Sequence, residues 1–312
     1  MTKKTQLKGV LMLLLTAFIW GAAFVAQSVA MDSIGAFTFS CSRTILGVLV
    51  LLPFILVRDN ISAKSMTQAQ LARRKAADKK TLIYGAILGV VFCAATNTQQ
   101  FAFNYTESGK IAFITALYMF FVPLFGIFMK KKTPLLTWIC VVFGFVGLFF
   151  LCMDPENMGA VNFGDVLSLI CAVIFAVHIL LIEKFAADVD GVKLSCVQFA
   201  VSAVLSGIAM LIFEEPSFPA IRAAALPIAY AGIMSCGIAY TFQIVGQKFT
   251  EATVASLIMC MESVFGVLCA AVILQEHLTA RELLGCGIMF VAIVLSQVSE
   301  PLTQKWKERK NI

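Results

Sequence analysis

The sequence predicts an all-α membrane protein in which ten transmembrane helices form two five-helix repeats of inverted topology. Three observations predict this fold class: the composition, ten long apolar runs, and the distribution of the cations. Hydrophobic residues make up 60% of the 312 residues and charged residues only 13%, against about 25% in soluble domains. The mean hydropathy is +0.91. This composition excludes disordered tails, nucleic-acid binders and secreted disulfide scaffolds.

Ten runs of about 18 or more residues carry few charges, and a helix of that length crosses a hydrocarbon core of about 30 Å. The expected spans are 8–30, 34–56, 82–105, 109–129, 135–153, 163–185, 192–213, 225–247, 253–274 and 280–299. The first run resembles a signal peptide, with Lys3 and Lys4 ahead of it. Its apolar core is longer than the roughly 7–15 residues of such signals, so we expect a retained helix.

The one long link, residues 58–80, is basic and has a helical composition. It is expected either to lie along the membrane surface against anionic headgroups or to form a solvated charged loop.

The cations predict the orientation of the chain. With the N-terminus inside, inner segments hold 20 of the 24 Lys and Arg residues, outer loops hold Lys110, Arg222 and Arg281, and Arg43 falls within a span. Because Lys and Arg are retained on the cytoplasmic side, both termini, including the basic tail 300–312, are expected in the cytoplasm. We therefore expect a multi-pass protein of a bacterial inner membrane.

The two halves, 1–155 and 156–299, resemble each other. At an offset of 155, Gly9 meets Gly164 and the Ser-Cys-x-Arg of 40–43 meets the Ser-Cys-x-Gln of 195–198; at an offset of 144, 104–107 meets 248–251. Five helices are an odd number, so the second half enters the membrane from the opposite side. Two such halves can open a central site to each side in turn, although a static channel can carry the same repeat.

Charged side chains at membrane depth cost about 2.5–3.5 kcal/mol each and are therefore site candidates. Arg43 and Glu262 both lie near mid-depth of their spans. They could contact a charged substrate group or a coupling proton, or they could form a structural ion pair.

Other polar and aromatic residues could line the same cavity. On 97–104, Asn97, Gln100 and Asn104 share one helix face, where either a wet cavity or interhelical bonds would satisfy them. His178 could carry a proton or pack in the core. The remaining candidates, which could equally be core or interface residues, are Trp20, Tyr118, Tyr240 and Gln243.

Two residues are expected to let helices bend: Pro123 in the fourth span and Gly266 in the ninth. All ten Cys fall within or at the end of spans without metal spacing, so packing is the expected role. There is no phosphate loop, His-Glu-x-x-His or nucleophile elbow. We expect no cofactor, no metal and no enzymatic activity.

Several motifs resemble the EamA family of the drug/metabolite transporter superfamily. They are Ile19-Trp-Gly-Ala-Ala-Phe-Val25, the run 37–47 ending in Arg-x-x-x-Gly, the run 108–123 ending in Val-Pro, Met261-Glu-Ser-Val-Phe265 and Glu276-His-Leu-Thr279. The chain departs from the family at Ser263, where a proline is usual, and at 130–132, where three lysines replace an acidic end.

The resemblance implies a central cavity built from the first, third, fourth, sixth, eighth and ninth helices. It also implies transport of small metabolites such as amino acids or nucleobase-like compounds. We therefore expect a secondary transporter, an exporter or exchanger, working by alternating access. A passive channel or facilitator stays open as the alternative, as does, with less support, a membrane sensor or enzyme. A homodimer also stays open.

Overall fold

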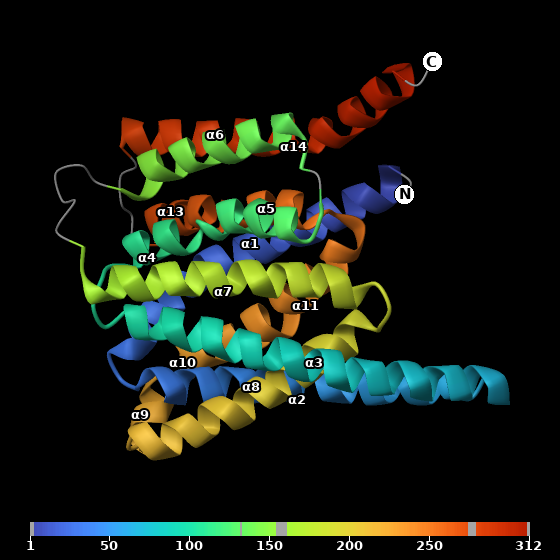
Figure 1. Ribbon diagram of the computed structural model, residues 1–312. Helices are drawn as coiled ribbons and strands as arrows, with labels where there is room; N and C mark the ends of the chain where they lie inside the picture. The colour runs from blue at the N-terminus through green and yellow to red at the C-terminus, as the bar shows by residue number, and fades with distance from the viewer. Residues whose placement is uncertain (1–2, 132, 154–160, 274–278, 311–312) are drawn as a thin grey trace.

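The computed structural model describes residues 3–131, 133–153, 161–273 and 279–310, and within them every regular element is helical (Figure 1). Side chains are described from Thr5 to Cys269 outside those gaps, and from Thr279 to Ser296. The elements are α1 (Lys3–Met31), α2 (Ala36–Ala63), α3 (Gln68–Ala102), α4 (Ser108–Thr115), α5 (Tyr118–Phe128), α6 (Leu135–Cys152), α7 (Phe163–Ala186), α8 (Gly191–Phe213), α9 (Phe218–Ala223), α10 (Ala225–Ala229), the π-helix η1 (Tyr230–Tyr240), α11 (Thr241–Gly246), the 3₁₀ turn η2 (Gln247–Phe249), α12 (Ala252–Met259), α13 (Met261–Ile273) and α14 (Ala280–Lys310).

Nine helical segments of the described chain are long and apolar enough to cross a membrane, and each matches one of the first nine predicted spans. The tenth predicted span lies in α14, whose side chains are described only up to Ser296, so it stays a prediction. The boundary at 155–156, the side chains of the tail 300–312 and the start of the Glu276–Thr279 motif lie outside the described residues.

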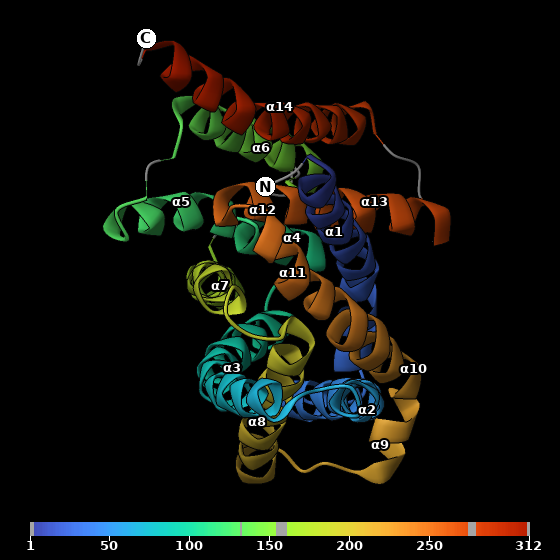
Figure 2. The same ribbon diagram turned by 90° about the vertical axis from the view of Figure 1, so that its right-hand side faces the viewer.

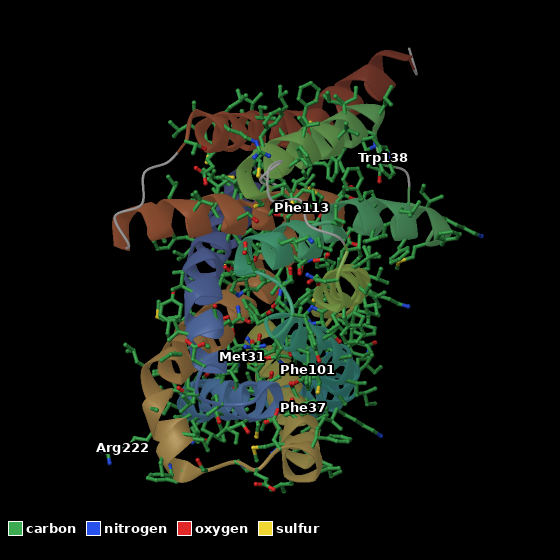
Figure 3. All side chains as sticks on the ribbon, turned by 90° about the vertical axis from the view of Figure 1, so that its left-hand side faces the viewer. Met31, Phe37, Phe101, Phe113, Trp138 and Arg222 are labelled. Atoms are coloured by element: carbon green, nitrogen blue, oxygen red, sulfur yellow. The ribbon has the colours of Figure 1, made fainter. Side chains whose placement is uncertain are left out.

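The long helices run side by side, and α6 packs with α14 at one edge of the bundle, away from α9 (Figures 1 and 2). The start of α1, the end of α14 and the α2–α3 turn lie on one side, which we call the basic end. The other side, where α9 lies, is the opposite end. There, the Phe37 and Phe101 rings of α2 and α3 meet edge to face, 4.9 Å apart (Figure 3).

The segment 58–80, expected as a surface segment or a solvated loop, is helical outside residues 64–67. Helix α2 continues to Ala63 and α3 begins at Gln68, so the two helices extend past the bundle as a hairpin (Figure 1). Thr67 accepts from the Gln70 N–H while the Gln70 side chain accepts from the Thr67 N–H, a capping box that starts α3. Because this run has helical composition and a cap, the helical conformation continues through it on both sides of the turn.

Helices α2 and α8 are fastened to each other at both ends. At the opposite end, the Glu214 carboxylate accepts from the backbone N–H groups of Phe37 and Thr38 at 2.9 and 2.8 Å, so α8 caps α2. At the basic end, Lys193 of α8 forms an ion pair with Asp59 of α2 at 2.7 Å. An offset of 155 relates the residues of the two clamps, 38 to 193 and 59 to 214.

Glycines bring paired helices into backbone contact. A Cβ on Gly9 would lie 2.8–3.0 Å from atoms of 246, 249 and 250, and one on Gly164 would lie 2.9–3.0 Å from atoms of 102, 105 and 106. The residue numbers of the two contact sets differ by 144, and those of the two glycines differ by 155. These are the same offsets that relate the two halves of the sequence. Helix α1 thus packs on the end of the eighth span as α7 packs on the end of α3.

Gly285→Ala is expected to destabilise the protein by about 1–3 kcal/mol, the usual cost of overpacking. A Cβ there would lie 2.7 Å from both the Gly147 carbonyl oxygen and the Leu151 nitrogen, and backbone atoms of α6 cannot move aside cheaply. Gly287→Ala on the same helix is the matched control, since its Cβ would meet nothing within 4 Å. Thermal unfolding in detergent measures both variants, and equal Tm values would contradict this account of the α6–α14 contact.

Candidate functional site

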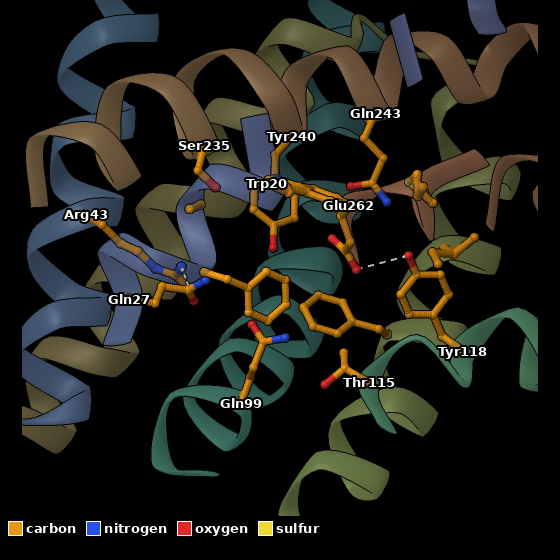
Figure 4. Close-up of a pocket in the computed structure, with 15 residues that line it drawn as sticks. Trp20, Gln27, Arg43, Gln99, Thr115, Tyr118, Ser235, Tyr240, Gln243 and Glu262 are labelled. Carbon is orange, nitrogen blue, oxygen red and sulfur yellow. Dashed lines mark hydrogen bonds between the residues drawn. The ribbon is translucent and has the colours of Figure 1, made fainter. Parts of the chain in front are cut away.

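A central cavity lies where seven of the predicted spans meet (Figure 4). It includes the six spans that the resemblance implied and also α2, through Arg43. Its lining residues are Trp20, Ala23, Phe24, Gln27, Arg43, Gln99, Thr115, Tyr118, Phe175, Ile179, Ser235, Tyr240, Gln243, Met259 and Glu262.

Arg43 lies at one end of this cavity, in the buried interior of the bundle with 2% of its surface exposed. Its Nη1 donates to Gln27 Oε1 at 3.4 Å, and its guanidinium lies 5.4 Å from the ring centre of Phe39. Its Nε and Nη2 have no hydrogen-bond partner among the described residues. A buried cation without a carboxylate partner is costly. The contacts within the folded protein therefore leave the Arg43 guanidinium without the anionic partner that it needs.

Glu262 lies at the other end of the cavity, 5% exposed, and accepts a hydrogen bond from the Tyr118 hydroxyl at 3.3 Å (Figure 4). The sequence positions 118 and 262 differ by 144, the offset that relates the halves. Of the alternatives left open for Arg43 and Glu262, a direct ion pair is not formed in the described structure. The cavity separates two unlike charged groups, one cationic and one acidic.

The helices that carry Tyr118 and Glu262 are interrupted just before these residues. Helix α4 ends at Thr115 and α5 begins at Tyr118; α12 ends at Met259 and α13 begins at Met261. The interruptions touch, since the Cys260 thiol donates to the Ala116 carbonyl at 3.6 Å. Backbone bonds continue through both interruptions, from Ala116 N–H to Ala112 O at 3.0 Å and from Cys260 N–H to Ser256 O at 3.1 Å, so each is a tightened turn of helix.

The two predicted bend positions lie further along these helices, Pro123 within α5 and Gly266 within α13, so their hinge role stays a prediction. Gly266 instead packs against α1, where its Cβ would lie 3.4 Å from the Gly21 carbonyl oxygen. Because residue 263 is a serine where the family usually has proline, it has a backbone N–H. This N–H donates to Cys260 O at 3.2 Å, a bond across three residues at the start of α13.

Several polar atoms that line the cavity have no partner among the described residues. They are Trp20 Nε1, Arg43 Nε and Nη2, Thr115 Oγ1 and Gln243 Oε1. Each unsatisfied buried group costs about 1–3 kcal/mol, so the wall is suited to a polar guest that both donates and accepts. The cavity measures about 30 Å³, room for one or two water molecules. This space is smaller than a typical metabolite site, which measures about 300 Å³ or more.

Six of the ten predicted site residues line the cavity: Trp20, Arg43, Tyr118, Tyr240, Gln243 and Glu262. The Trp20 and Tyr240 rings lie 4.5 Å apart and form an aromatic wall (Figure 4).

The other four predicted residues lie elsewhere. Asn97 donates to Ser206 of α8 at 2.9 Å and Gln100 to the Gln27 carbonyl at 3.2 Å, so interhelical bonds use their donors, while Asn97 Oδ1 and Gln100 Oε1 have no partner among the described residues. Asn104 lies exposed beyond the end of α3. His178 bonds Gln198 at 2.8 Å and packs near Phe92, away from the cavity.

The sequence reasoning missed four polar lining residues: Gln27, Gln99, Thr115 and Ser235. Gln27 could have been found, since it lies seven residues after Trp20 on the same helix face. Ser235 could not have been found from the sequence, because residues five apart lie on different faces of an α-helix. The segment η1 is a π-helix, in which residues five apart lie on nearly the same face, so Ser235 and Tyr240 both line the cavity.

Within the described residues no group of three or more His, Cys, Asp or Glu side chains could hold a metal ion. The ten cysteines are all free, and six of them are buried. The unpartnered groups that line the cavity are amide, indole, hydroxyl and guanidinium groups. Such groups bind ligands by hydrogen bonds and charge.

Comparison with known proteins identifies the family and supports the fold. The EamA-like transporter family matches residues 7–153 and again 162–297. An uncharacterized transporter of Archaeoglobus fulgidus is 25% identical over 289 residues, covering 91% of this chain and 83% of that protein. One crystal structure superposes with a TM-score of 0.75 at 16% identity, over 94% of this chain and 98% of that one, which shows the fold alone. The chain belongs to the EamA-like transporter family.

Proposed function

We propose that this membrane transporter is a secondary carrier of a small zwitterionic metabolite of the amino-acid type. The observation that carries the proposal is the separation of two unlike charged groups across one cavity, Arg43 at one end and Glu262 at the other. An unpartnered guanidinium fits a carboxylate, which it can bind through two parallel hydrogen bonds. A carboxylate at the far end fits an ammonium group or a proton. A nucleobase would leave the guanidinium without an anion, so the amino-acid class is favoured.

The aromatic wall supplies contact for the rest of the substrate. Trp20 and Tyr240 stack beside the cavity, and amphipathic rings of this kind pack against apolar groups while their N–H or O–H binds polar ones. Gln99 and Gln243, which differ by 144 in sequence, offer amides from the two halves. We expect these amides to orient the substrate between the charged groups.

We further propose that ten helices form two inverted repeats, about 1–155 and 156–299, that alternate access to the cavity. The double match of the family, the paired glycine contacts and the paired interruptions at 116–117 and 260 support this. Two crevices add support: one of about 300 Å³ lies towards the basic end and includes 251–253, and one of about 400 Å³ lies towards the opposite end and includes 107–109. These segments also differ by 144.

The basic end is proposed to face the cytoplasm of a bacterial cell, near anionic headgroups, with both termini inside. Export or exchange would then carry the substrate from the crevice at the basic end towards the opposite end. A proton that exchanges with the substrate ammonium at Glu262 would provide coupling.

Counterflow in proteoliposomes tests this proposal. Vesicles loaded with one amino acid are expected to take up a labelled amino acid faster than empty vesicles, with saturable kinetics, and a panel of amino acids and nucleobases identifies the class. Uptake that does not saturate and is not stimulated by internal substrate would instead identify a passive facilitator. Counterflow by nucleobases alone would contradict the zwitterion assignment.

A further inference from the structure

The crevice at the opposite end reaches the centre of the protein. It lies among α1, α4, α6, α13 and α14 and holds about 400 Å³. Its lining residues are Gly21, Phe24, Val25, Glu107, Ser108, Gly109, Ala112, Leu151, Cys152, Glu262, Ser263, Gly266, Val267 and Glu282. Glu262 and Phe24 line both this crevice and the central cavity, so the Glu262 carboxyl group belongs to the wall between them.

The crevice carries one sign of charge. Its lining includes three carboxyl groups, Glu107, Glu262 and Glu282, and no Lys, Arg or His. Glu107 is exposed, and Glu282 is partly exposed and caps α14 by accepting from the Thr279 N–H at 2.7 Å. A cleft lined by one sign of charge between low-dielectric walls concentrates counterions, here cations.

A buried hydroxyl near Glu262 also lines the crevice. Ser263 is 3% exposed, and its Oγ has no hydrogen-bond partner among the described residues. The space is large enough for several water molecules, and each needs two to four polar partners. Ser108, Ser263 and the carboxyl groups supply such partners along the crevice.

The crevice at the basic end differs in its charges. Its lining holds two carboxylates, Glu183 and Glu251, together with Lys131; Glu183 is paired with Lys131 and also accepts from the Ala252 N–H at the start of α12 at 3.3 Å. Its lining does not include Tyr118, which corresponds to Glu262. This crevice therefore neither reaches the equivalent position nor presents an unpaired acidic wall there.

We propose that the crevice at the opposite end is the route by which a proton from the outer solution reaches Glu262. Glu107 and Glu282 concentrate cations at the mouth, and water held by Ser263 passes the proton to a Glu262 carboxylate oxygen. The net step transfers one proton from hydronium to carboxylate; the relaying water gains one O–H bond and loses another, so it is unchanged at the end. The inference rests on the proposed orientation and on coupling at Glu262, but it names a physical path that can be tested without transport.

Thiol reagents of opposite charge test the path directly. A Gly109→Cys variant places a thiol in the crevice, since a Cβ there meets nothing closer than 3.8 Å; Cys152 is a second probe already present. In sealed vesicles with the opposite end outside, a membrane-impermeant cationic methanethiosulfonate is expected to modify these sites about tenfold faster than an anionic one. Peptide mass spectrometry separates them from the other cysteines.

Charge variants decide whether the crevice acids cause that preference. Combining Glu107→Gln with Glu282→Gln is expected to reduce the preference to about two- to threefold, and Gln keeps the helix cap. Glu215→Gln is the matched control, an exposed acid at the same end that does not line the crevice. Equal rates for both reagents, or the same loss with Glu215→Gln, would overturn the route.

Proton arrival at Glu262 is read from Trp20, which lines the same central cavity. With Trp138→Phe and Trp306→Phe, the remaining indole fluorescence is expected to respond to a jump in external pH. The response should disappear in Glu262→Gln and slow at least tenfold after Gly109→Cys is modified. A response that survives both changes would contradict the route, whereas a normal response in vesicles that transport nothing would contradict only the proposed function.

Discussion

Arg43→Gln is expected to weaken substrate binding about 100-fold without lowering Tm. Each hydrogen bond to a charged group contributes about 1.5–3 kcal/mol, so losing a two-bond contact with a carboxylate removes about 3 kcal/mol. The folded protein loses only a 3.4 Å bond to Gln27 and a ring contact with Phe39, and it no longer buries an unpaired cation. Binding is measured by ligand-induced thermal stabilisation, and folding by Tm without ligand.

This pair of measurements separates binding from structure. A structural ion pair would lose about 3–5 kcal/mol of stability on removal of one partner, and Tm would fall steeply. Arg222→Gln is the control: Arg222 is exposed at the opposite end and points away from the bundle (Figure 3), and its loss should change neither quantity. A large drop in Tm for Arg43→Gln with unchanged substrate affinity would refute the assignment.

Glu262→Gln is expected to remove the pH dependence of substrate affinity and to weaken affinity about tenfold or more. In the native protein, protonation neutralises Glu262, so affinity for an ammonium group should fall as the pH falls. Glutamine has the same shape and can still accept from the Tyr118 hydroxyl, so the cavity wall should persist. The measurement is substrate Kd across a range of pH, together with accumulation driven by an imposed proton gradient.

The control for this prediction makes the same Glu-to-Gln change at an exposed position outside the cavity. Glu215→Gln removes an exposed carboxylate and should leave both the pH profile and the gradient-driven accumulation as they are. If Glu262→Gln keeps the native pH profile, Glu262 is not the coupling group. Retained exchange with lost accumulation would support the coupling role specifically.

The helices were predictable because a bilayer leaves the backbone few options. An apolar run must satisfy its own N–H and C=O groups, so length and hydropathy alone give nine of the spans. Departures within a span are set by contacts from other helices, which a local pattern does not contain. The interruption at Cys260, where the thiol bonds Ala116, and the π-helix that aligns Ser235 with Tyr240 are of this kind.

The site was predictable where a side chain is costly in lipid. Arg43 and Glu262 stand out from their apolar spans and do line one cavity. Uncharged amides carry less information, because a neighbouring helix can satisfy them as well as water can. Asn97 bonds Ser206 and does not line the cavity, whereas Gln99 does. The rotation of α3 relative to α8 decides which of these two amides faces the cavity.

The contacts that join α2 to α8 at both ends limit which helices can move independently of each other. Helix α2 belongs to the first half of the sequence and α8 to the second, yet Glu214 holds Thr38 at one end and Lys193 holds Asp59 at the other. Helices joined at both ends travel together. If the proposed carrier alternates access, we therefore expect α2 and α8 to move as one body made from both halves of the sequence, so that the moving parts divide across the chain and not between its halves.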